Sequence, residues 1–559
     1  MGVLLMVGED RRRRGRRTPS VERLEGRTLL SGYSGLSRMR NLATNTGVYN
    51  IRIDGPGFLK VHQLPRGVVD LNVLGTTSGS TLTVSLVRPR PHKAATLLPV
   101  QELNVVSRQL GAINAGSVLL AGAMTPLTNS VSLLSFGALG RGAQIDVNGD
   151  VGTMLTPNVD LGPTGHVVIN GDLNGGLAAG SMQINTMTID GGRFVIGRDS
   201  LSPIQIGGDL TLGQNGLLAI GRDLIGRFGS EGDHFPALTV SGTIQLDAGG
   251  EIYVGRNVEG LYVGGDVLSN PGSSGILVQG ELNTLYVDGF FQGQGSATSV
   301  DLGVGLDLTG FAVNGGADGV GGVQSANINI GKNLTNVYVA HGIFRSWITS
   351  GASISNVTIG PDVPTAIYNS EMDAVVSINN VVAQGDVKSD FPTNAGATGY
   401  PTRIIAGKAR NGVFQANGQI NGFQIQGSLI DSVLAASVAP YGGDGTLPPP
   451  VPYGSVPRTA PPPPAGFSNY NAPGGITVNS NGSRTKNFSI RSFDASGQAL
   501  PVAVYDTATD PDVHATVLDG GVVTATVGGS VISNPHDDRF DFTGVFAVHT
   551  AGVDGGLSP

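Results

Sequence analysis

The chain has 559 residues, a formal net charge of -8 and no cysteine, and only 14% of its residues are charged. The lack of cysteine excludes disulfides, thiolate metal sites and cysteine nucleophiles. Hydrophobic residues make up 40% of the chain and glycine contributes 87 residues. This composition supports a folded core and favours a β architecture with many tight turns.

The N-terminal stretch differs in charge from the remainder of the chain. The first 30 residues hold eight arginines and four acidic residues, which leaves 26 basic and 38 acidic residues beyond them. The acidic remainder argues against a nucleic-acid partner. No uninterrupted apolar run approaches the roughly 18 residues that a membrane helix needs, so no transmembrane helix is predicted.

An arginine cluster at residues 11–17 precedes the run Leu24–Leu30, which reads Leu-Glu-Gly-Arg-Thr-Leu-Leu. This run resembles the N-terminal Leu-Glu-Pro-Arg-x-Leu-Leu motif of large secreted repeat proteins of planctomycetes, with Gly26 in place of the proline. In that family the motif follows an arginine-rich stretch and is taken to be a sorting signal. The resemblance spans residues 1–32 and implies export. We therefore expect residues 1–46 to be a disordered sorting segment and the protein to be extracellular or at the cell surface. A basic arm that binds by charge alone is the alternative.

Short strands are expected over residues 47–144. Residues 48–53 alternate between apolar and polar before a turn at 54–57. Two further runs, at 71–74 and 81–87, flank a turn rich in Gly, Ser and Thr, which is typical of a β-hairpin. We predict that this segment is an N-terminal β cap region.

Residues 145–439 repeat one phrase, namely apolar, any, apolar, any, Gly, polar, apolar. Copies include Ile145–Val151, Ile204–Leu210, Leu218–Leu224, Leu261–Val267 and Ile328–Leu334. Each copy predicts a short strand with alternating inward and outward residues, followed by a turn. We attribute the Gly, Asp and Asn residues of these turns to left-handed backbone.

Stacking of such coils buries the inner residues that one coil alone leaves exposed. The body therefore resembles a parallel β-helix. We predict an all-β fold, a right-handed parallel β-solenoid of about 13 coils of about 22 residues each, with N- and C-terminal β caps. In this arrangement Ile204, Ile206 and Leu210 face the core. An antiparallel sandwich is disfavoured because it needs no such self-similarity.

Two further segments follow the repeats. Residues 440–466 are rich in proline and predict a stiff linker. Residues 467–559 alternate again and predict a C-terminal β domain or cap. A cap would cover the open edge of the last coil, which otherwise invites pairing with other chains.

The loop at residues 222–236 is the densest group of titratable side chains. Its candidates are Arg222, Asp223, Arg227, Glu231, Asp233 and His234. If the protein is an enzyme, these acids and bases would be catalytic, as in a β-helix polysaccharide lyase or hydrolase. A solvated loop between coils is the alternative.

Four tyrosines occupy the middle of the strand phrase, where side chains point outward. They are Tyr253, Tyr262, Tyr286 and Tyr338. Stacked in neighbouring coils, they would form a strip that binds extracellular glycans or other cell-surface components. Ordinary cross-strand ladders are the alternative.

Aspartates recur in the turns, and Asp209 and Asp266 are examples. Aligned carboxylates repel one another, and Ca²⁺ would relieve that repulsion with oxygen ligands. The requirements of the turn alone are the simpler explanation, and the nonapeptide calcium repeat is absent. We predict no cofactor.

The eight histidines are scattered singly, and the chain lacks Gly-x-Ser-x-Gly and phosphate-loop motifs. These absences, with that of Gly-x-Gly-x-x-Gly, argue against common hydrolases, dehydrogenases and NTPases. They do not exclude β-helix enzymes, whose sites are assembled across coils. We predict a non-enzymatic, exported structural or adhesive surface protein. The alternatives are a carbohydrate-active β-helix enzyme and a glycan-binding module.

Overall fold

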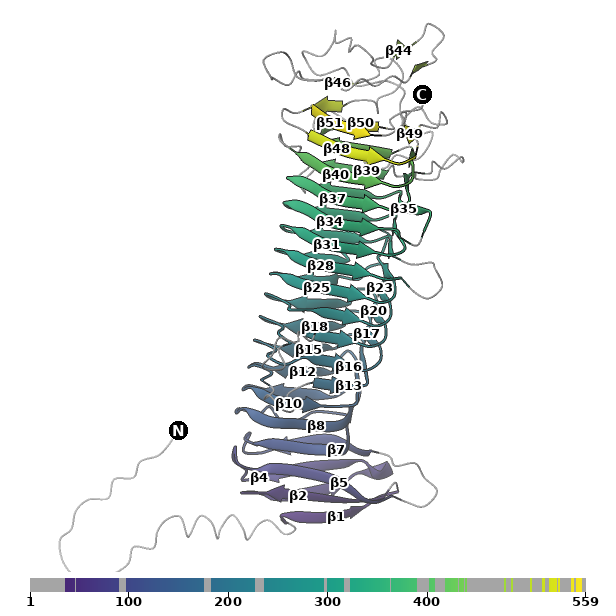
Figure 1. The fold of residues 1–559 in the computed structure, drawn as a ribbon. Coiled ribbons are helices and arrows are strands. Elements are labelled where there is room, and N and C mark those ends of the chain that lie inside the picture. Colours follow the sequence, from purple (N-terminus) through teal and green to yellow (C-terminus); the bar gives the residue numbers. More distant parts are fainter. Residues whose placement is uncertain are drawn as a thin grey trace, which may run out of the picture.

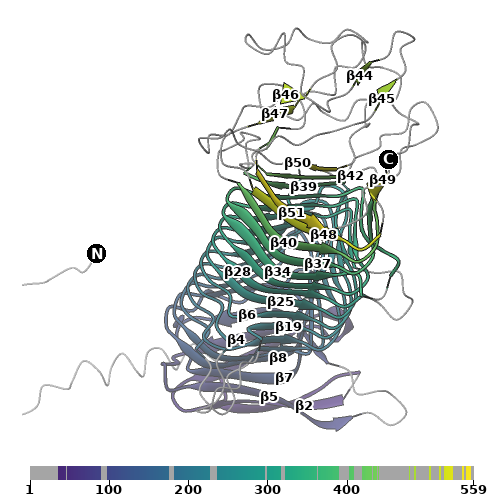
Figure 2. The ribbon, with the colours of Figure 1, turned by 45° about the horizontal axis from the view of Figure 1, so that its top comes forward.

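The fold is that of a computed structural model, in which strands stack into a rod (Figures 1 and 2). It describes residues 36–45, 47–89, 97–174, 182–226, 236–295, 299–315, 322–361, 363–389, 402–407, 418–430, 432–436 and 438–439, and strand segments at 477–478, 484–485, 503–504, 515–517, 522–529, 531–532, 544–546 and 549–554.

The rod is a parallel β-solenoid whose coils each contribute one strand to each of three parallel stacks. The first stack is β10 (Val151–Leu155), β13 (Met182–Ile184), β16 (Ile204–Ile206), β19 (Leu238–Val240), β22 (Leu261–Val263), β25 (Leu282–Val287), β28 (Leu308–Val313), β31 (Leu334–Val339), β34 (Ser353–Ile359), β37 (Ser377–Ala383), β40 (Gln419–Ile425), β48 (Val522–Val527) and β51 (His549–Asp554).

The second stack lies one turn further along each coil. It is β11 (Asn158–Leu161), β14 (Thr186–Ile189), β17 (Leu210–Leu212), β20 (Ile244–Leu246), β23 (Val267–Ser269), β26 (Phe291–Gln292), β29 (Val323–Gln324), β32 (Ile343–Phe344), β35 (Thr365–Tyr368), β38 (Asp386–Lys388), β41 (Leu429–Ile430) and β49 (Val531–Ile532).

The third stack closes the coil and leads back to the first. It is β9 (Gln144–Val147), β12 (His166–Ile169), β15 (Arg193–Ile196), β18 (Leu217–Ile220), β21 (Glu251–Val254), β24 (Gly275–Val278), β27 (Leu302–Val304), β30 (Asn327–Ile330), β33 (Trp347–Ser350), β36 (Glu371–Ala374), β39 (Thr402–Ala406), β42 (Ser432–Ala436) and β50 (Gly544–Phe546).

The N-terminal end of the rod begins with antiparallel strands. Its elements are β1 (Met39–Ala43), β2 (Gly47–Asp54), β3 (Phe58–Gln63), the 3₁₀ turn η1 (Pro65–Gly67), β4 (Val69–Leu74), β5 (Thr81–Pro89), β6 (Leu98–Val105), β7 (Ala112–Leu120) and β8 (Val131–Leu139). β2 pairs antiparallel with β1 and β5, and β3 with β4. Parallel pairing starts with β4 to β6 and β5 to β7, and β8 then pairs with both β10 and β11. The long strand β8 is thus followed by two shorter strands in the next coil.

Two sequence predictions need correction at this end. The turn at residues 75–80 does not close a hairpin, because β4 pairs with β3 and β6 whereas β5 pairs with β2 and β7. β1 lies within the stretch 1–46 that we assigned to the sorting segment, so the folded rod starts before residue 47. The first difference arises from pairing between strands that are distant in the chain, β2 with β5 and β4 with β6, which local alternation does not specify. β1, in contrast, pairs with β2, its neighbour in the chain.

The described C-terminal strands extend the sheets of the rod. β48, β49 and β50 pair in parallel with β40, β41 and β42, and β51 follows β48. Antiparallel pairs also form among the short strands β43 (Val438–Ala439), β44 (Thr477–Val478), β45 (Arg484–Thr485), β46 (Ala503–Val504) and β47 (Ala515–Val517). The predicted linker at 440–466 lies outside the described residues.

The core is one apolar cluster that runs from Leu42 to Val527. Alternate residues of each short strand enter it, and Ile204, Ile206 and Leu210 each have 0% of their surface exposed. The predicted inward register is therefore confirmed. No helix in the described part of the chain is long and apolar enough to span a bilayer.

Ile206→Asp tests this register. The buried carboxylate would have no partner in the core, so we expect the free energy of unfolding to fall by about 3 kcal/mol or more. Chemical denaturation followed by circular dichroism gives the value. The matched control is Gln205→Asp, because Gln205 is exposed on the same strand and should lose far less. Equal losses in the two variants would contradict the register.

Candidate functional site

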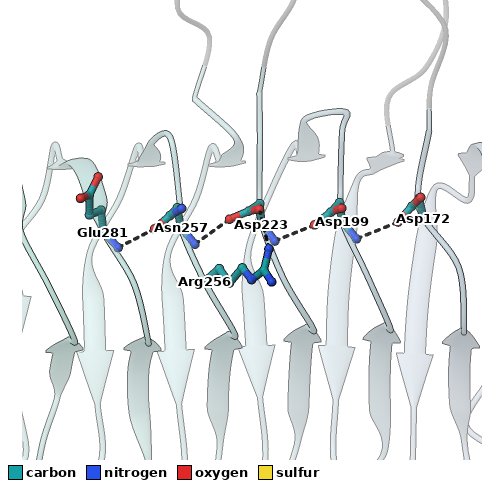
Figure 3. A network of polar contacts seen from close by, with 6 residues as sticks. All are labelled: Asp172, Asp199, Asp223, Arg256, Asn257 and Glu281. Carbon is teal, nitrogen blue, oxygen red and sulfur yellow. Dashed lines mark hydrogen bonds and ion pairs between the residues drawn. The ribbon is translucent and has the colours of Figure 1, made fainter.

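The turns that follow the third stack carry a continuous row of polar side chains (Figure 3). Its members occupy equivalent positions in successive coils and are called the acid ladder: Asp150, Asp172, Asp199, Asp223, Asn257 and Glu281. From Asp172 onward, the backbone N–H of each member donates to the Oδ1 atom of the member in the preceding coil, whereas the Asp150 N–H donates to Ser130 Oγ. The N···O distances are 2.9 Å for Asp172 to Asp150, 3.0 Å for Asp199 to Asp172 and 3.0 Å for Asp223 to Asp199.

A second series of acids uses the same bond after the first stack. Asp209 accepts the Thr243 N–H at 2.8 Å, and Asp266 accepts the Phe290 N–H at 3.0 Å. Thr243 takes the aspartate position between them, and its hydroxyl lies 3.4 Å from the Asp266 nitrogen. Our two calcium candidates are thus two coils apart, and each has one carboxylate oxygen bonded to backbone. No group of three metal-ligating side chains occurs among the described residues.

The glycines of the phrase have a different role from the one we expected. A Cβ atom added to Gly171 would lie 2.2 Å from Asp150 Oδ1, and one added to Gly289 would lie 2.0 Å from Asp266 Oδ1. In two coils an arginine stands between the glycine and the aspartate, as in Gly221-Arg-Asp223. There, a Cβ atom added to Gly221 would lie 2.2 Å from the Gly197 carbonyl oxygen. None of these glycines has a φ in the left-handed region. Close approach of the neighbouring coil therefore requires glycine here, and our attribution to left-handed backbone is wrong.

The same correction applies to the aspartates. Of the recurrent turn aspartates that the structure describes, none has a positive φ. They are retained in the phrase because the side chain satisfies a backbone N–H that the turn leaves without a strand partner. In each Gly-Asp pair, the glycine leaves room for the carboxylate of the preceding coil, and the aspartate accepts a hydrogen bond from the backbone of the next coil.

Only part of the proposed catalytic loop is described. Asp223 Oδ1 accepts the Asn257 N–H at 3.0 Å, and Arg256 Nη1 lies 4.0 Å from Asp223 Oδ2. Both carboxylate oxygens thus have structural neighbours. Arg222 is exposed, and its N–H donates to the Arg198 carbonyl at 3.1 Å. Arg227, Glu231, Asp233 and His234 lie outside the described residues, so their catalytic role stays a prediction.

Three of the four tyrosines share one face of the rod. Tyr262 and Tyr286 are direct partners in β22 and β25, with ring centroids 5.4 Å apart and an interplanar angle of 13°. Tyr338 follows in the same register, with Ala312 between it and Tyr286. Tyr253 lies in the third stack between Ala219 and Leu277. The predicted strip therefore contains Tyr262, Tyr286 and Tyr338, and Tyr253 belongs to another face.

No protein-family model, curated protein or solved structure matches this chain.

The sequence did not point to two polar residues beside the tyrosines, Asp288 and Asn314. The Tyr262 hydroxyl donates to Asp288 Oδ2 at 2.6 Å, and Asn314 Nδ2 lies 3.1 Å from Asp288 Oδ1 and 2.5 Å from the Tyr286 hydroxyl. The bond to Asp288, together with burial and the carboxylate charge, raises the pKa of Tyr262. Asp288 and Asn314 each stand two residues after the outward position of their strand, and that shared spacing was the available signal.

A further carboxylate lies inside the rod. Asp301 has 0% of its surface exposed and accepts the N–H groups of Asn327 at 2.8 Å and Gln294 at 3.2 Å. Burial raises its pKa, and these backbone donors oppose the increase. Asp301 joins the turn before β27 to the next coil, as the acid ladder does at the surface.

Asp199→Ala tests the acid ladder. The Asp223 N–H would lose its acceptor, so we expect a loss of about 1–2 kcal/mol in the free energy of unfolding. Asp199→Asn is the matched control, since it keeps an oxygen at Oδ1 as Asn257 does in the native ladder, and it should lose less than about 0.5 kcal/mol. Denaturation with 1 mM CaCl₂ and with EDTA completes the test. Equal losses for Ala and Asn, or strong stabilisation by calcium, would contradict the structural role.

Proposed function

We propose that the protein is an exported, non-enzymatic structural or adhesive protein of the cell surface. The observation that carries the proposal is the use of the recurrent acids. These acids recur in the turns of the repeated phrase, and their carboxylates accept hydrogen bonds from the backbone of the next coil along the rod. When the repeated polar residues hydrogen-bond neighbouring coils to one another, they stabilise a long rod with an extended surface. Such a rod suits a structural or adhesive protein.

The N-terminal segment supports the location. The arginine-rich residues 11–17 and the run Leu24–Leu30 differ in composition from the acidic body. A segment so unlike the domain it precedes suits a targeting signal better than a structural role. Its resemblance to the planctomycete sorting motif is the basis for proposing export to the cell surface or the extracellular space.

The catalytic alternative has less support. Asp223, one of its two described candidates, accepts a backbone N–H and faces Arg256. A general acid or base must instead reach a proton on the substrate. Glycan binding does have a specific observation in its favour, the tyrosine column, which is developed below.

Removal of residues 1–32 tests the location. We expect the truncated chain to stay in the cytoplasm of the native host, whereas the full chain reaches the surface or medium. Cell fractionation with immunoblotting and N-terminal sequencing measures both. Replacement of residues 1–32 with a Gly/Ser segment of equal length is the control for chain length, and it should also be retained. Normal export of the truncated chain, or a cytoplasmic native protein with Met1 intact, would overturn the proposal.

A further inference from the structure

The outward tyrosine column of the first stack is interrupted at one coil. Thr239, Tyr262, Tyr286, Ala312 and Tyr338 are successive partners in the parallel register. Tyr262 and Tyr286 form a stacked pair, and Tyr338, with 39% of its surface exposed, comes two coils after Tyr286. We call the position beside Ala312, between Tyr286 and Tyr338, the tyrosine gap.

The spacing of the coils sets the size of the tyrosine gap. Neighbouring strands are about 4.8 Å apart, so Tyr286 and Tyr338 are separated by about 10 Å along the rod. A ring in van der Waals contact with an aromatic face on each side needs roughly 7–8 Å. The native Tyr262–Tyr286 pair shows that each coil can hold one ring at this position. The tyrosine gap thus has the length of one missing ring.

The residues beneath the tyrosine gap are small. β28 presents Gly310 and Ala312 outward, where β25 has Thr284 and Tyr286. A Cβ added to Gly310 would lie 3.4 Å from Thr284 Oγ1. The backbone of β28 is therefore covered by less side-chain volume than that of its neighbours, and a ligand ring would rest on Ala312.

Polar groups lie at one edge of the tyrosine gap. Asn314 follows Ala312 by two residues, and its amide nitrogen contacts both Asp288 and the Tyr286 hydroxyl. These contacts fix the position of the Tyr286 ring and place an amide and a carboxylate beside the gap. Both N–H groups of Asn314 are used in these contacts, so the pair offers acceptors for ligand hydroxyls, namely Asn314 Oδ1 and the remaining lone pairs of Asp288. The negative charge of Asp288 disfavours an anionic ligand.

We propose that the tyrosine gap binds one neutral pyranose ring of a surface glycan, stacked between Tyr286 and Tyr338. The apolar C–H faces of the sugar contact the two aromatic rings, and its hydroxyls donate to Asn314 Oδ1 and to the Asp288 carboxylate. The inference rests on the proposed adhesive function and names its ligand class. An aromatic side chain of a protein partner is the competing occupant.

The test uses the purified full chain on an array of neutral and uronate-containing oligosaccharides, followed by calorimetric titration with the best-bound neutral oligosaccharide. Ala312→Tyr supplies the missing ring and should weaken binding by about tenfold or more. Tyr338→Ala removes one wall and should weaken it to a similar extent. Ala312→Ser, which keeps the gap open, and Tyr253→Ala, on another face, should bind like the native chain. Circular dichroism melting checks that each variant is folded.

Several outcomes would overturn the inference. These are the absence of neutral-glycan binding, a preference for uronates, equal binding by the native chain and Ala312→Tyr, and capture of aromatic peptides in place of glycans. Export and cell attachment are measured separately by fractionation and adhesion assays. If Ala312→Tyr attaches to cells as the native chain does, the tyrosine gap is refuted while the adhesive function stands. If the native chain is not exported, the proposed function fails irrespective of glycan binding.

Discussion

The spacing of about 4.8 Å between stacked strands constrains every other feature of this protein. Parallel pairing in register brings equivalent residues of successive coils into contact, so any side chain that recurs becomes a column. Inward columns form a continuous apolar core from Leu42 to Val527. In the turns, equivalent residues of neighbouring coils must either leave room for one another or form hydrogen bonds. In the repeated phrase, Gly leaves the room and Asp forms the hydrogen bond.

The acid ladder shows how a column of like charges is tolerated. Each carboxylate from Asp150 to Asp223 accepts a charge-assisted bond from the backbone of the next coil. Asn257 interrupts the run of carboxylates, and Arg256 lies 4.0 Å from Asp223. Exposed Arg198, Arg222 and Arg256 follow one another in the same turns. In the turns of Asp199, Asp223 and Asn257, these three arginines offset the charge of the two aspartates.

The alternation of Ile204, Ile206 and Leu210 was predictable because the strand period of two is a local property. The fold class followed from the repetition of that pattern. The partners of β4 and β5 were not predictable, since pairing between distant strands depends on the whole end of the rod. The roles of Gly171 and Asp150 were also not predictable. The Asp150 carboxylate lies against Gly171 only once the two coils are stacked.

The candidate site was predictable in part for the same reason. Outward orientation of Tyr286 and Tyr338 followed from alternation, but their alignment depends on the length of each coil. Successive members of the acid ladder are 22, 27, 24, 34 and 24 residues apart, so a fixed period does not yield the register. The apposition across Ala312 and the contribution of Asn314 needed the folded rod.

Amide hydrogen exchange at the turns tests the central claim most directly. Mass spectrometry with residue-resolving fragmentation would follow the amides of Asp172, Asp199, Asp223 and Asn257 in the native chain. If side chains of the preceding coil accept hydrogen bonds from these amides, the amides will exchange as slowly as those of the adjoining strands β12, β15, β18 and β21. Exchange at the rate of an unstructured peptide, with the strand amides still protected, would contradict the ladder and with it the account of how the coils are joined.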